Sequence, residues 1–248
     1  MEVHHPHHPT HKKKWSEYFL EFFMLFIAVT LGFFAENQRE HFVEKHREKQ
    51  YMESLLLDLE KDKMEIEAAR KFTNTQIANI DTAIGLLTKG IWSKENLKTM
   101  YRVSLKTGGS RPISFVESTS TQLKTGGMRL IEDKNITKLI TDYWQLLAQM
   151  NQAQTNSFDT WKTSIKNMTY KIFDGTNYID VKNKIINDNA VLMTYDPIYL
   201  KEYNNRLLNL KFDLKNYLVD YFYDRIGSTI LALQKEIKLK YNITEKIE

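Results

Sequence analysis

The chain has 248 residues, enough to bury a sizeable core in one domain or two small ones. It contains no cysteine, which excludes disulfides, thiol nucleophiles and cysteine-ligated zinc. Its 35 basic and 31 acidic residues are interspersed and give a net charge of only +4, so no broad basic surface forms and no nucleic-acid partner is expected. Only nine glycines and four prolines occur, so the composition predicts an all-α fold.

Residues 1–14 are rich in histidine and contain two prolines, a composition that cannot build a core, so this tail is predicted to be disordered. Neutral imidazole is a common ligand of Zn, Ni and Cu ions, which makes the tail a weak candidate for metal binding. The candidate ligands are His4, His5, His7, His8 and His11. A solvated tail whose charge rises below about pH 6.5 is the favoured interpretation. No cofactor is expected.

Residues 15–35 are the most apolar stretch and predict a transmembrane helix. The strictly uncharged run, Phe22 to Ala35, would be about 21 Å long at roughly 1.5 Å per helical residue, which is shorter than a hydrocarbon core of about 30 Å. A helix that starts at Trp15, with its first aromatic side chains at the headgroup level, is long enough to cross. The side chains predicted to anchor it are Trp15, Tyr18, Phe22, Phe26, Leu31 and Phe34.

A cleaved signal peptide or a buried helix of a soluble protein would also contain a long apolar stretch. Phe33 stands where a signal-peptidase site needs a small residue, so cleavage is not expected. Bulky residues occur around every face, and a soluble protein would need an enclosing core to cover them. We therefore favour an uncleaved single-pass anchor with membrane lipid as its partner.

Glu21 is a carboxylate inside the apolar stretch. It follows Glu17 by one helical turn and lies near the lysines at 12–14, so an interfacial side chain that reaches water or those lysines is favoured. The alternative is a functional carboxylate that faces a partner helix or an ion path, because charge inside a span is costly.

Basic residues flank both ends of the predicted span, at 12–14 before it and at Arg39, Lys45, Arg47 and Lys49 after it. The positive-inside rule therefore does not decide the orientation. We expect a cytoplasmic amino terminus, an inner-membrane span and a periplasmic helical domain.

After Glu36 no helix breaker occurs before Gly85, and residues 36–90 predict one long amphipathic helix that can continue from the span. Its apolar positions recur at steps of three and four residues: Met52, Leu56, Leu59, Ile66, Ile77, Ile80, Ile84 and Leu87. The charged blocks 44–49 and 60–67 predict a solvent-facing stripe with ion pairs between successive turns. Asp58 and Asp62 are assigned to the same solvated stripe.

Residues 91–134 are the least regular and predict an irregular connection with short helices, because Pro112 and two glycine pairs mark turns. Thr119 to Gln122 fits a capping box and predicts a short helix that ends at Gly126-Gly127. The glycine pair lacks the spacing of a phosphate-binding loop, so nucleotide binding is not expected.

The sequence Gln-Leu-Lys-Thr-Gly-Gly-Met-Arg-Leu-Ile over 122–131 precedes a helical pattern with Ile136, Leu139, Ile140, Asp142, Tyr143 and Trp144. Together with Phe-Ala-Glu-Asn-Gln-Arg-Glu over 34–40, it resembles an uncharacterised family of single-pass membrane proteins of Bacteroidetes-type bacteria, a domain of unknown function. From Asn151 onward the match is only that of generic helix. The resemblance implies an inner-membrane anchor with a helical domain outside the cytoplasm, and it implies no activity.

Residues 135–248 predict a helical bundle. The apolar positions from Ile136 to Met150 and from Phe158 to Ile172 indicate one long helix or two in line. Asp196 before Pro197 predicts a helix start. The core face that follows is predicted to contain Leu200, Tyr203, Leu207, Leu210, Leu214, Tyr217 and Tyr221, then Ile230, Leu233 and Ile237. This spacing also permits coiled-coil association, so a homo-oligomer is a candidate assembly.

The sequence carries no nucleophile motif, and every histidine lies at or before His46, so no enzyme is expected. The favoured function is a membrane-anchored helical interaction or scaffold protein that binds itself or another envelope protein. The first alternative is a sensor or transporter accessory subunit that uses the span and Glu21. The second is a small-ligand binder or enzyme in the helical domain, for which a deep polar-lined pocket would be the sign.

Overall fold

The computed structural model describes residues 14–90, 92–109, 111–155 and 159–243. The five candidate histidine ligands of the tail lie outside these described residues. The chain is helical nearly throughout, which confirms the all-α prediction. It forms two compact units, Met1–Gln50 and Tyr51–Glu248.

Helix α1 (Trp15–Lys89) covers both the apolar stretch and the segment for which the sequence predicts a long helix. No proline interrupts it. The helix ends where Gly90 adopts a left-handed conformation, with φ of 62°, and donates its N–H to the carbonyl of Leu86 at 3.1 Å. Glycine is favoured at this position because it has no Cβ to clash in that conformation.

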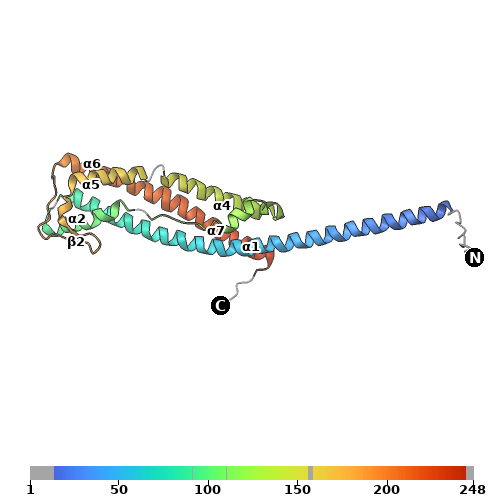
Figure 1. Cartoon of the computed structure of the whole chain (residues 1–248). Coiled ribbons are helices and arrows are strands. Elements are labelled where there is room, and N and C mark those ends of the chain that lie inside the picture. The colour runs from blue at the N-terminus through green and yellow to red at the C-terminus, as the bar shows by residue number, and fades with distance from the viewer. Residues whose placement is uncertain (1–13, 91, 110, 156–158, 244–248) are drawn as a thin grey trace, which may run out of the picture. The chain divides into compact units, whose positions relative to one another are not determined.

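The second unit is built from four rods of secondary structure (Figure 1). The first rod is α1 from Tyr51 onward. The second consists of α2 (Lys94–Thr107), an extended segment over 111–117 that we call the strap, α3 (Ser118–Lys124) and the short η1 (Gly127–Leu130). The third contains α4 (Lys134–Ala153) and α5 (Asp159–Ile172), and the fourth contains α6 (Pro197–Phe212), the π-helical η4 (Asp213–Tyr223) and α7 (Asp224–Tyr241).

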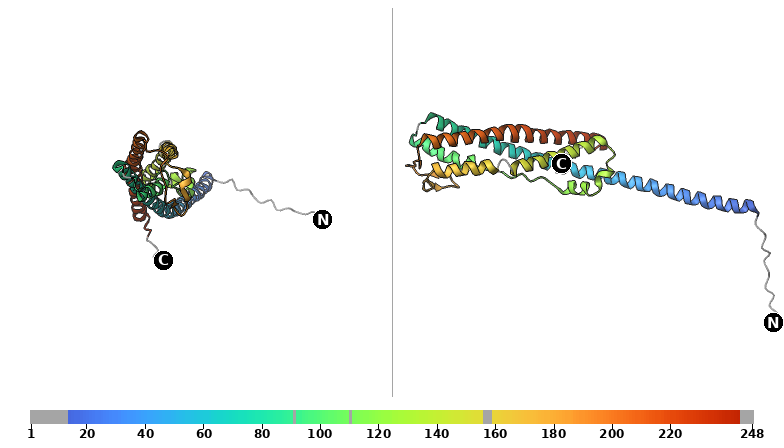
Figure 2. Two further views of the ribbon diagram at one scale, coloured as in Figure 1. Left: turned by 90° about the vertical axis from the view of Figure 1, so that its left-hand side faces the viewer. Right: turned by 90° about the horizontal axis from the view of Figure 1, so that it is seen from above.

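Neighbouring rods run in opposite directions. Along α1 and the fourth rod, Glu60 accepts from Gln234 at 2.9 Å, Arg70 pairs with Asp224 at 2.5 Å, and Asp81 pairs with Lys211 at 2.5 Å, so later positions on one rod meet earlier positions on the other. In the same way α4 packs on α7 and α5 on α6. The rods of this unit are seen end on and from above in Figure 2. The result is an up–down–up–down helical bundle.

A small cap joins the third rod to the fourth. It contains η3 (Gly175–Asn177) and an antiparallel hairpin of β1 (Tyr178–Asp180) and β2 (Ile185–Ile186), with Tyr178 opposite Ile186. The next helix begins as predicted: Asp196 accepts a hydrogen bond from the N–H of Ile198 at 2.8 Å, and Pro197 occupies the first helical position.

The capping box predicted at Thr119 to Gln122 is wrong, although a short helix is present. The helix begins at Ser118, and no side chain of its own caps it. Asp58 on α1 supplies the acceptor instead, because its carboxylate takes the N–H of Thr119 at 3.2 Å and the hydroxyl of Ser118 at 3.1 Å. The glycine pair that ends α3 permits close packing, since a Cβ on Gly127 would lie only 3.3 Å from the ring of Tyr51.

The predicted core face of the fourth rod is correct as far as Leu214 and again at Ile230, Leu233 and Ile237, which are fully buried, but it is wrong at Tyr217 and Tyr221. Tyr217 and Tyr221 are 54% and 39% exposed, whereas Leu218 and Phe222 are buried. The reason is the π-helical stretch η4, in which each turn takes an additional residue, so positions projected with an α-helical period rotate out of the core.

Candidate functional site

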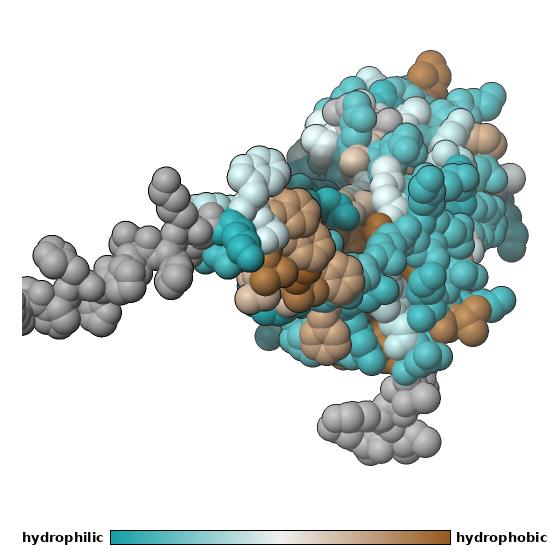
Figure 3. Space-filling model, turned by 90° about the vertical axis from the view of Figure 1, so that its right-hand side faces the viewer, coloured by the Kyte–Doolittle hydropathy of each residue, from teal (hydrophilic) through white to brown (hydrophobic). Residues whose placement is uncertain are grey.

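The side chains of the apolar segment between Trp15 and Ala35 are exposed, and no other described part of the chain buries them. Its large apolar side chains are between 39% and 88% exposed, and no part of its most apolar window is buried. The six predicted anchors, Trp15, Tyr18, Phe22, Phe26, Leu31 and Phe34, are all among them. Figure 3 shows apolar side chains gathered on this segment. The helix is long and apolar enough to cross a membrane, judged by length and composition.

The segment has two unlike faces. In a helix, positions separated by four, seven and eleven residues lie on one side, so Glu21 shares a face with Leu25, Ala28 and Gly32. Phenylalanines occupy the other side, where Phe19 stacks on Phe23 and Phe22 on Phe26, with ring centroids 6.2 and 6.4 Å apart. A Cβ added at Gly32 would meet nothing within 4 Å. The carboxylate and the smallest side chains therefore share one face.

In the second unit, three acidic side chains of α1 hold the strap. Glu65 pairs with Arg111 at 2.7 Å, Asp62 accepts the N–H of Val116 at 2.8 Å, and Asp58 caps α3 as described above. An extended segment has no hydrogen bonds of its own, so its buried N–H groups need acceptors from neighbouring elements. The spacing of the three acids matches successive turns of α1.

Asp62 is the most buried of these groups and also accepts the hydroxyl of Tyr143 on α4 at 2.6 Å. Burial raises the pKa of the Asp62 carboxyl, against the opposite influence of hydrogen bonds from Tyr143 and Val116. Burial also raises the pKa of Tyr143, and the neighbouring negative charge adds to this effect. This group of residues joins α1, the strap and α4.

The assignment of Asp58 and Asp62 to a solvated stripe is therefore wrong: they are only 7% and 2% exposed. Along the sequence Asp62 belongs to the charged block 60–67 and Asp58 lies just before it, which hides their burial. The signal that identifies Asp62 is its position, three residues after Leu59 and four before Ile66, both buried, which places it on the apolar face of α1. Tyr143 belongs by its spacing to the apolar positions of its helix, and nothing local in the sequence indicates its partner.

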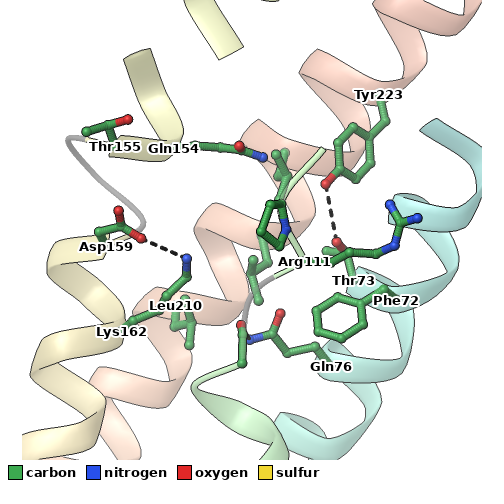
Figure 4. Close-up of a pocket in the computed structure, with 14 residues that line it drawn as sticks. Phe72, Thr73, Gln76, Arg111, Gln154, Thr155, Asp159, Lys162, Leu210 and Tyr223 are labelled. Atoms are coloured by element: carbon green, nitrogen blue, oxygen red, sulfur yellow. Dashed lines mark hydrogen bonds and ion pairs between the residues drawn. The ribbon is translucent and has the colours of Figure 1, made fainter. Parts of the chain in front are cut away.

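A cavity of about 260 Å³ lies where α1, the strap, the end of α4, the start of α5 and the fourth rod meet (Figure 4). Phe72, Pro112, Leu210, Leu214 and Leu218 supply its apolar side chains. The other lining side chains are polar or charged: Thr73, Gln76, Arg111, Gln154, Thr155, Asp159, Lys162 and Tyr223.

Several polar groups of the cavity are hydrogen-bonded or ion-paired. Figure 4 shows Thr73 and Tyr223 directed toward each other, with their oxygens 3.5 Å apart, and Asp159 paired with Lys162 at 2.8 Å. Gln76 donates to the carbonyls of Thr107 and Gly109 at 2.6 and 2.9 Å, so it ties α1 to the end of α2. Because each cation is paired with a carboxylate, the cavity carries no net charge that would select a charged ligand.

A second hollow of about 420 Å³ lies beside the strap, lined by Phe115, Ser120, Lys124, Tyr143 and Trp144 among others. The indole Nε1 of Trp144 is buried, and it has no hydrogen-bond partner among the described residues. The ammonium of Lys124 lies 4.7 Å from the centre of the indole ring.

Within the described residues no group of three or more histidine, aspartate and glutamate side chains is placed to hold a metal ion. Comparison of the chain with protein-family models, with curated proteins and with solved structures finds no match in any of the three. The resemblance to the bacterial single-pass family therefore stays a prediction.

Proposed function

We propose that this protein is a membrane-anchored helical scaffold or interaction protein, held in a bilayer by residues 15–35. The observation that carries the proposal is the uncovered apolar surface of this segment. Leaving one large apolar side chain in water rather than burying it costs about 1.5–3 kcal/mol, and here such residues occupy every face. A hydrocarbon environment removes that cost.

The length of the segment agrees with a single crossing. From Trp15 to Ala35 a helix rises about 31 Å at roughly 1.5 Å per residue, which matches a hydrocarbon core of about 30 Å. Trp15 and Tyr18 would lie at the headgroup level, where amphipathic aromatic side chains are favoured. We place the amino terminus in the cytoplasm, the span in the inner membrane and the bundle in the periplasm.

The proposed role of the bundle is to bind another copy of itself or another envelope protein. Apolar side chains on its outer surface support this role, such as Leu57 and Met64, which are 67% and 64% exposed on the same side of α1. Exposed apolar side chains that cluster mark interaction surfaces. Chemical crosslinking in intact cells should therefore recover a dimer or a discrete envelope partner.

The anchor is tested by fractionation of cells that express the full chain. We expect the protein in the membrane pellet, resistant to salt and carbonate and released by detergent. Phe26→Asp combined with Leu31→Asp should move it to the soluble fraction, because each charge in a span costs about 2.5–3.5 kcal/mol.

Phe42→Asp is the matched control, because Phe42 is 75% exposed on the same helix but lies beyond the predicted span. This variant should stay in the membrane. Recovery of the unmodified chain from the soluble fraction without detergent would refute the anchor. Protease protection of each end in spheroplasts tests the sidedness.

A second candidate function, a sensor or transporter accessory subunit, is favoured by the face that Glu21 shares with Ala28 and Gly32. Small residues let helices approach closely in lipid, and a carboxylate in a span usually faces protein or water. Glu21→Gln discriminates between the two functions. A lost cellular phenotype with unchanged membrane insertion supports the accessory subunit, and an unchanged phenotype supports a plain anchor.

A further inference from the structure

The cavity of about 260 Å³ is lined by three buried polar side chains whose hydrogen bonding is incomplete. They are Thr73 and Gln76 of α1 and Tyr223 of η4, and they are 3%, 5% and 2% exposed. Polar groups this far from bulk solvent are almost always hydrogen-bonded, so unused capacity at three of them in one cavity needs an explanation.

The hydroxyl of Thr73 does not bond to its own helix. Thr75, Thr82 and Thr88 of α1 each donate to the carbonyl four residues earlier, at 2.8–2.9 Å. Within the described chain, the hydroxyl of Thr73 meets only that of Tyr223, at 3.5 Å. An ordinary bond between hydroxyl groups is about 2.7–2.8 Å long, so these two bind each other weakly and both can take a further partner.

Gln76 presents a free acceptor to the cavity. Its Nε2 donates to the carbonyls of Thr107 and Gly109, and this fixes the orientation of the amide, because only the nitrogen can donate. The amide oxygen Oε1 receives no hydrogen bond from any described residue. In Figure 4 it is directed toward the other side chains that line the cavity. Since Gln76 follows Thr73 by three residues, the two side chains lie on one face of α1.

Tyr223 reaches the cavity because η4 is π-helical. Leu218 and Tyr223 both line the cavity and are five residues apart. At about 3.6 residues per turn, an α-helix directs such a pair to different sides. In a π-helix the backbone hydrogen bonds join residues five apart, so the two side chains lie on one side. The irregular stretch therefore places a hydroxyl beside a leucine in the same cavity, and π-helical turns occur frequently at functional sites.

Water alone suits this lining poorly. A cavity of about 260 Å³ has room for several water molecules, but its five apolar side chains offer them no hydrogen bonds. Roughly 150 Å³ is enough for benzene, so a substituted ring fits this volume. The charged side chains do not favour an ion, because Arg111 is paired with Glu65 and Lys162 with Asp159.

We propose that this cavity binds a small neutral molecule that carries a hydroxyl on an apolar body, of the size of a substituted phenol. The ligand hydroxyl donates to Oε1 of Gln76 and accepts from Thr73 or Tyr223, which completes the hydrogen bonding of the polar side chains. The apolar body packs against the leucines of the fourth rod and displaces water from them. An ether of the same shape leaves Gln76 without a donor and binds less tightly. All lining residues belong to the second unit, so this inference does not depend on the membrane anchor.

The test is equilibrium dialysis of radiolabelled 4-ethylphenol against the full chain in nanodiscs, with binding to empty nanodiscs subtracted. We expect saturable binding of about one molecule per chain, with a Kd on the order of 0.1 mM, as is usual for a ligand of this size. The methyl ether 4-ethylanisole lacks the donor and should bind about tenfold less tightly, and ethylbenzene less tightly still. If the chain is soluble without lipid, the same dialysis is carried out on it directly.

Substitutions that keep the shape of the side chains test the polar lining. Thr73→Val combined with Tyr223→Phe removes both hydroxyls and should weaken binding of 4-ethylphenol about tenfold, while binding of ethylbenzene stays the same. The matched control is Thr75→Val combined with Tyr203→Phe. Neither residue lines the cavity, although Tyr203 is fully buried, so the control should bind 4-ethylphenol as the natural chain does.

Absence of saturable binding by the folded chain would show that the cavity holds only water and would overturn the proposal. Equal affinity for 4-ethylphenol and ethylbenzene would also overturn it, because the polar side chains would then select nothing. An undiminished affinity in the Thr73 and Tyr223 variant, or an equal loss in the control, would place the binding elsewhere. Circular dichroism and thermal unfolding verify that each variant is folded, and the three compounds tested on the natural chain decide the matter if a variant is not.

Discussion

Asp62 illustrates how one buried carboxylate organises several elements. It lies on the core side of α1 and accepts from Val116 of the strap and from Tyr143 of α4. A buried charge without a cation is tolerated when hydrogen bonds satisfy it, although its desolvation remains costly. The raised pKa of Asp62 reflects that cost.

This pKa gives a pH-dependent stability with a definite sign. The folded chain holds the Asp62 proton more tightly than the unfolded chain, whose carboxyl has a pKa of about 3.9. The contribution of Asp62 to the free energy of unfolding is therefore greatest below the unfolded pKa and is lost as the pH rises through the raised folded pKa. Asp62→Asn should remove this slope, because an amide can accept from Val116, donate to Tyr143 and carries no charge.

Urea unfolding of the natural chain and the Asn variant between about pH 2 and pH 8 measures this difference. Asp133 is a control of opposite sign. Hydrogen bonds from Ile136 and Asn135 lower its pKa, so its stabilising contribution is present at neutral pH and lost on acidification. Asp133→Ala should cost about 1 kcal/mol at neutral pH and less in acid. A difference between the natural chain and the Asn variant that is constant with pH would contradict the expectation for Asp62.

For single residues, the sequence identifies the role of a side chain when its partners are close to it in the sequence. Asp196 could be predicted as a helix cap because the N–H group that it accepts from lies two residues away. The exposed aromatic residues of the apolar segment could also be predicted, because the run of apolar residues around them is visible in the sequence. The roles of Asp58 and Asp62 could not be predicted from composition, because their partners lie more than fifty residues away in the strap, α3 and α4.

Among the elements, the π-helical stretch η4 has the most direct effect on which residues form the core. It lies between α6 and α7 without a break in the rod, and it changes the side that faces inward. Tyr217, which an α-helical projection places in the core, is therefore exposed, and Phe222 is buried in the core instead. No proline or glycine occurs in residues 213–223, so the sequence gives no local sign of the irregularity.

Alanine substitution at these two positions tests the register. Phe222→Ala should lower the free energy of unfolding by about 3–5 kcal/mol, because it removes a buried ring from a packed core. Tyr217→Ala should change it by no more than about 0.5 kcal/mol, since surface positions tolerate truncation. Denaturant unfolding of both variants measures the two values, and a larger loss at Tyr217 would show that the α-helical projection is right.

At the scale of the whole molecule, the described chain contains an exposed apolar segment near its amino terminus and a helical bundle with a buried core. All of the buried apolar cluster lies between Met52 and Ile237. The helical nature, the long first helix and the apolar segment could be predicted from composition and periodicity. The order in which the rods pack could not be predicted, because the second rod contains the extended strap, whose Val116 N–H is bound by Asp62, far away in the sequence.

A chain that begins at Tyr51 should therefore fold without the first unit. We expect a soluble fragment with high helical content by circular dichroism and a single cooperative unfolding transition, because its core is complete. The full chain in detergent is the control and should unfold at a similar denaturant concentration. Aggregation of the fragment, or unfolding without cooperativity, would show that residues before Tyr51 contribute to the core.

The antiparallel contact between α1 and the fourth rod has a consequence for the order of synthesis. Arg70 and Asp224 are separated by 154 residues, and Glu60 and Gln234 by 174. During translation the apolar face of α1 leaves the ribosome long before the residues that cover it, since α7 is among the last elements made. The apolar face of α1 is therefore exposed in the nascent chain until the fourth rod has been made, and during this interval a chaperone that binds apolar surfaces would protect the chain from aggregation.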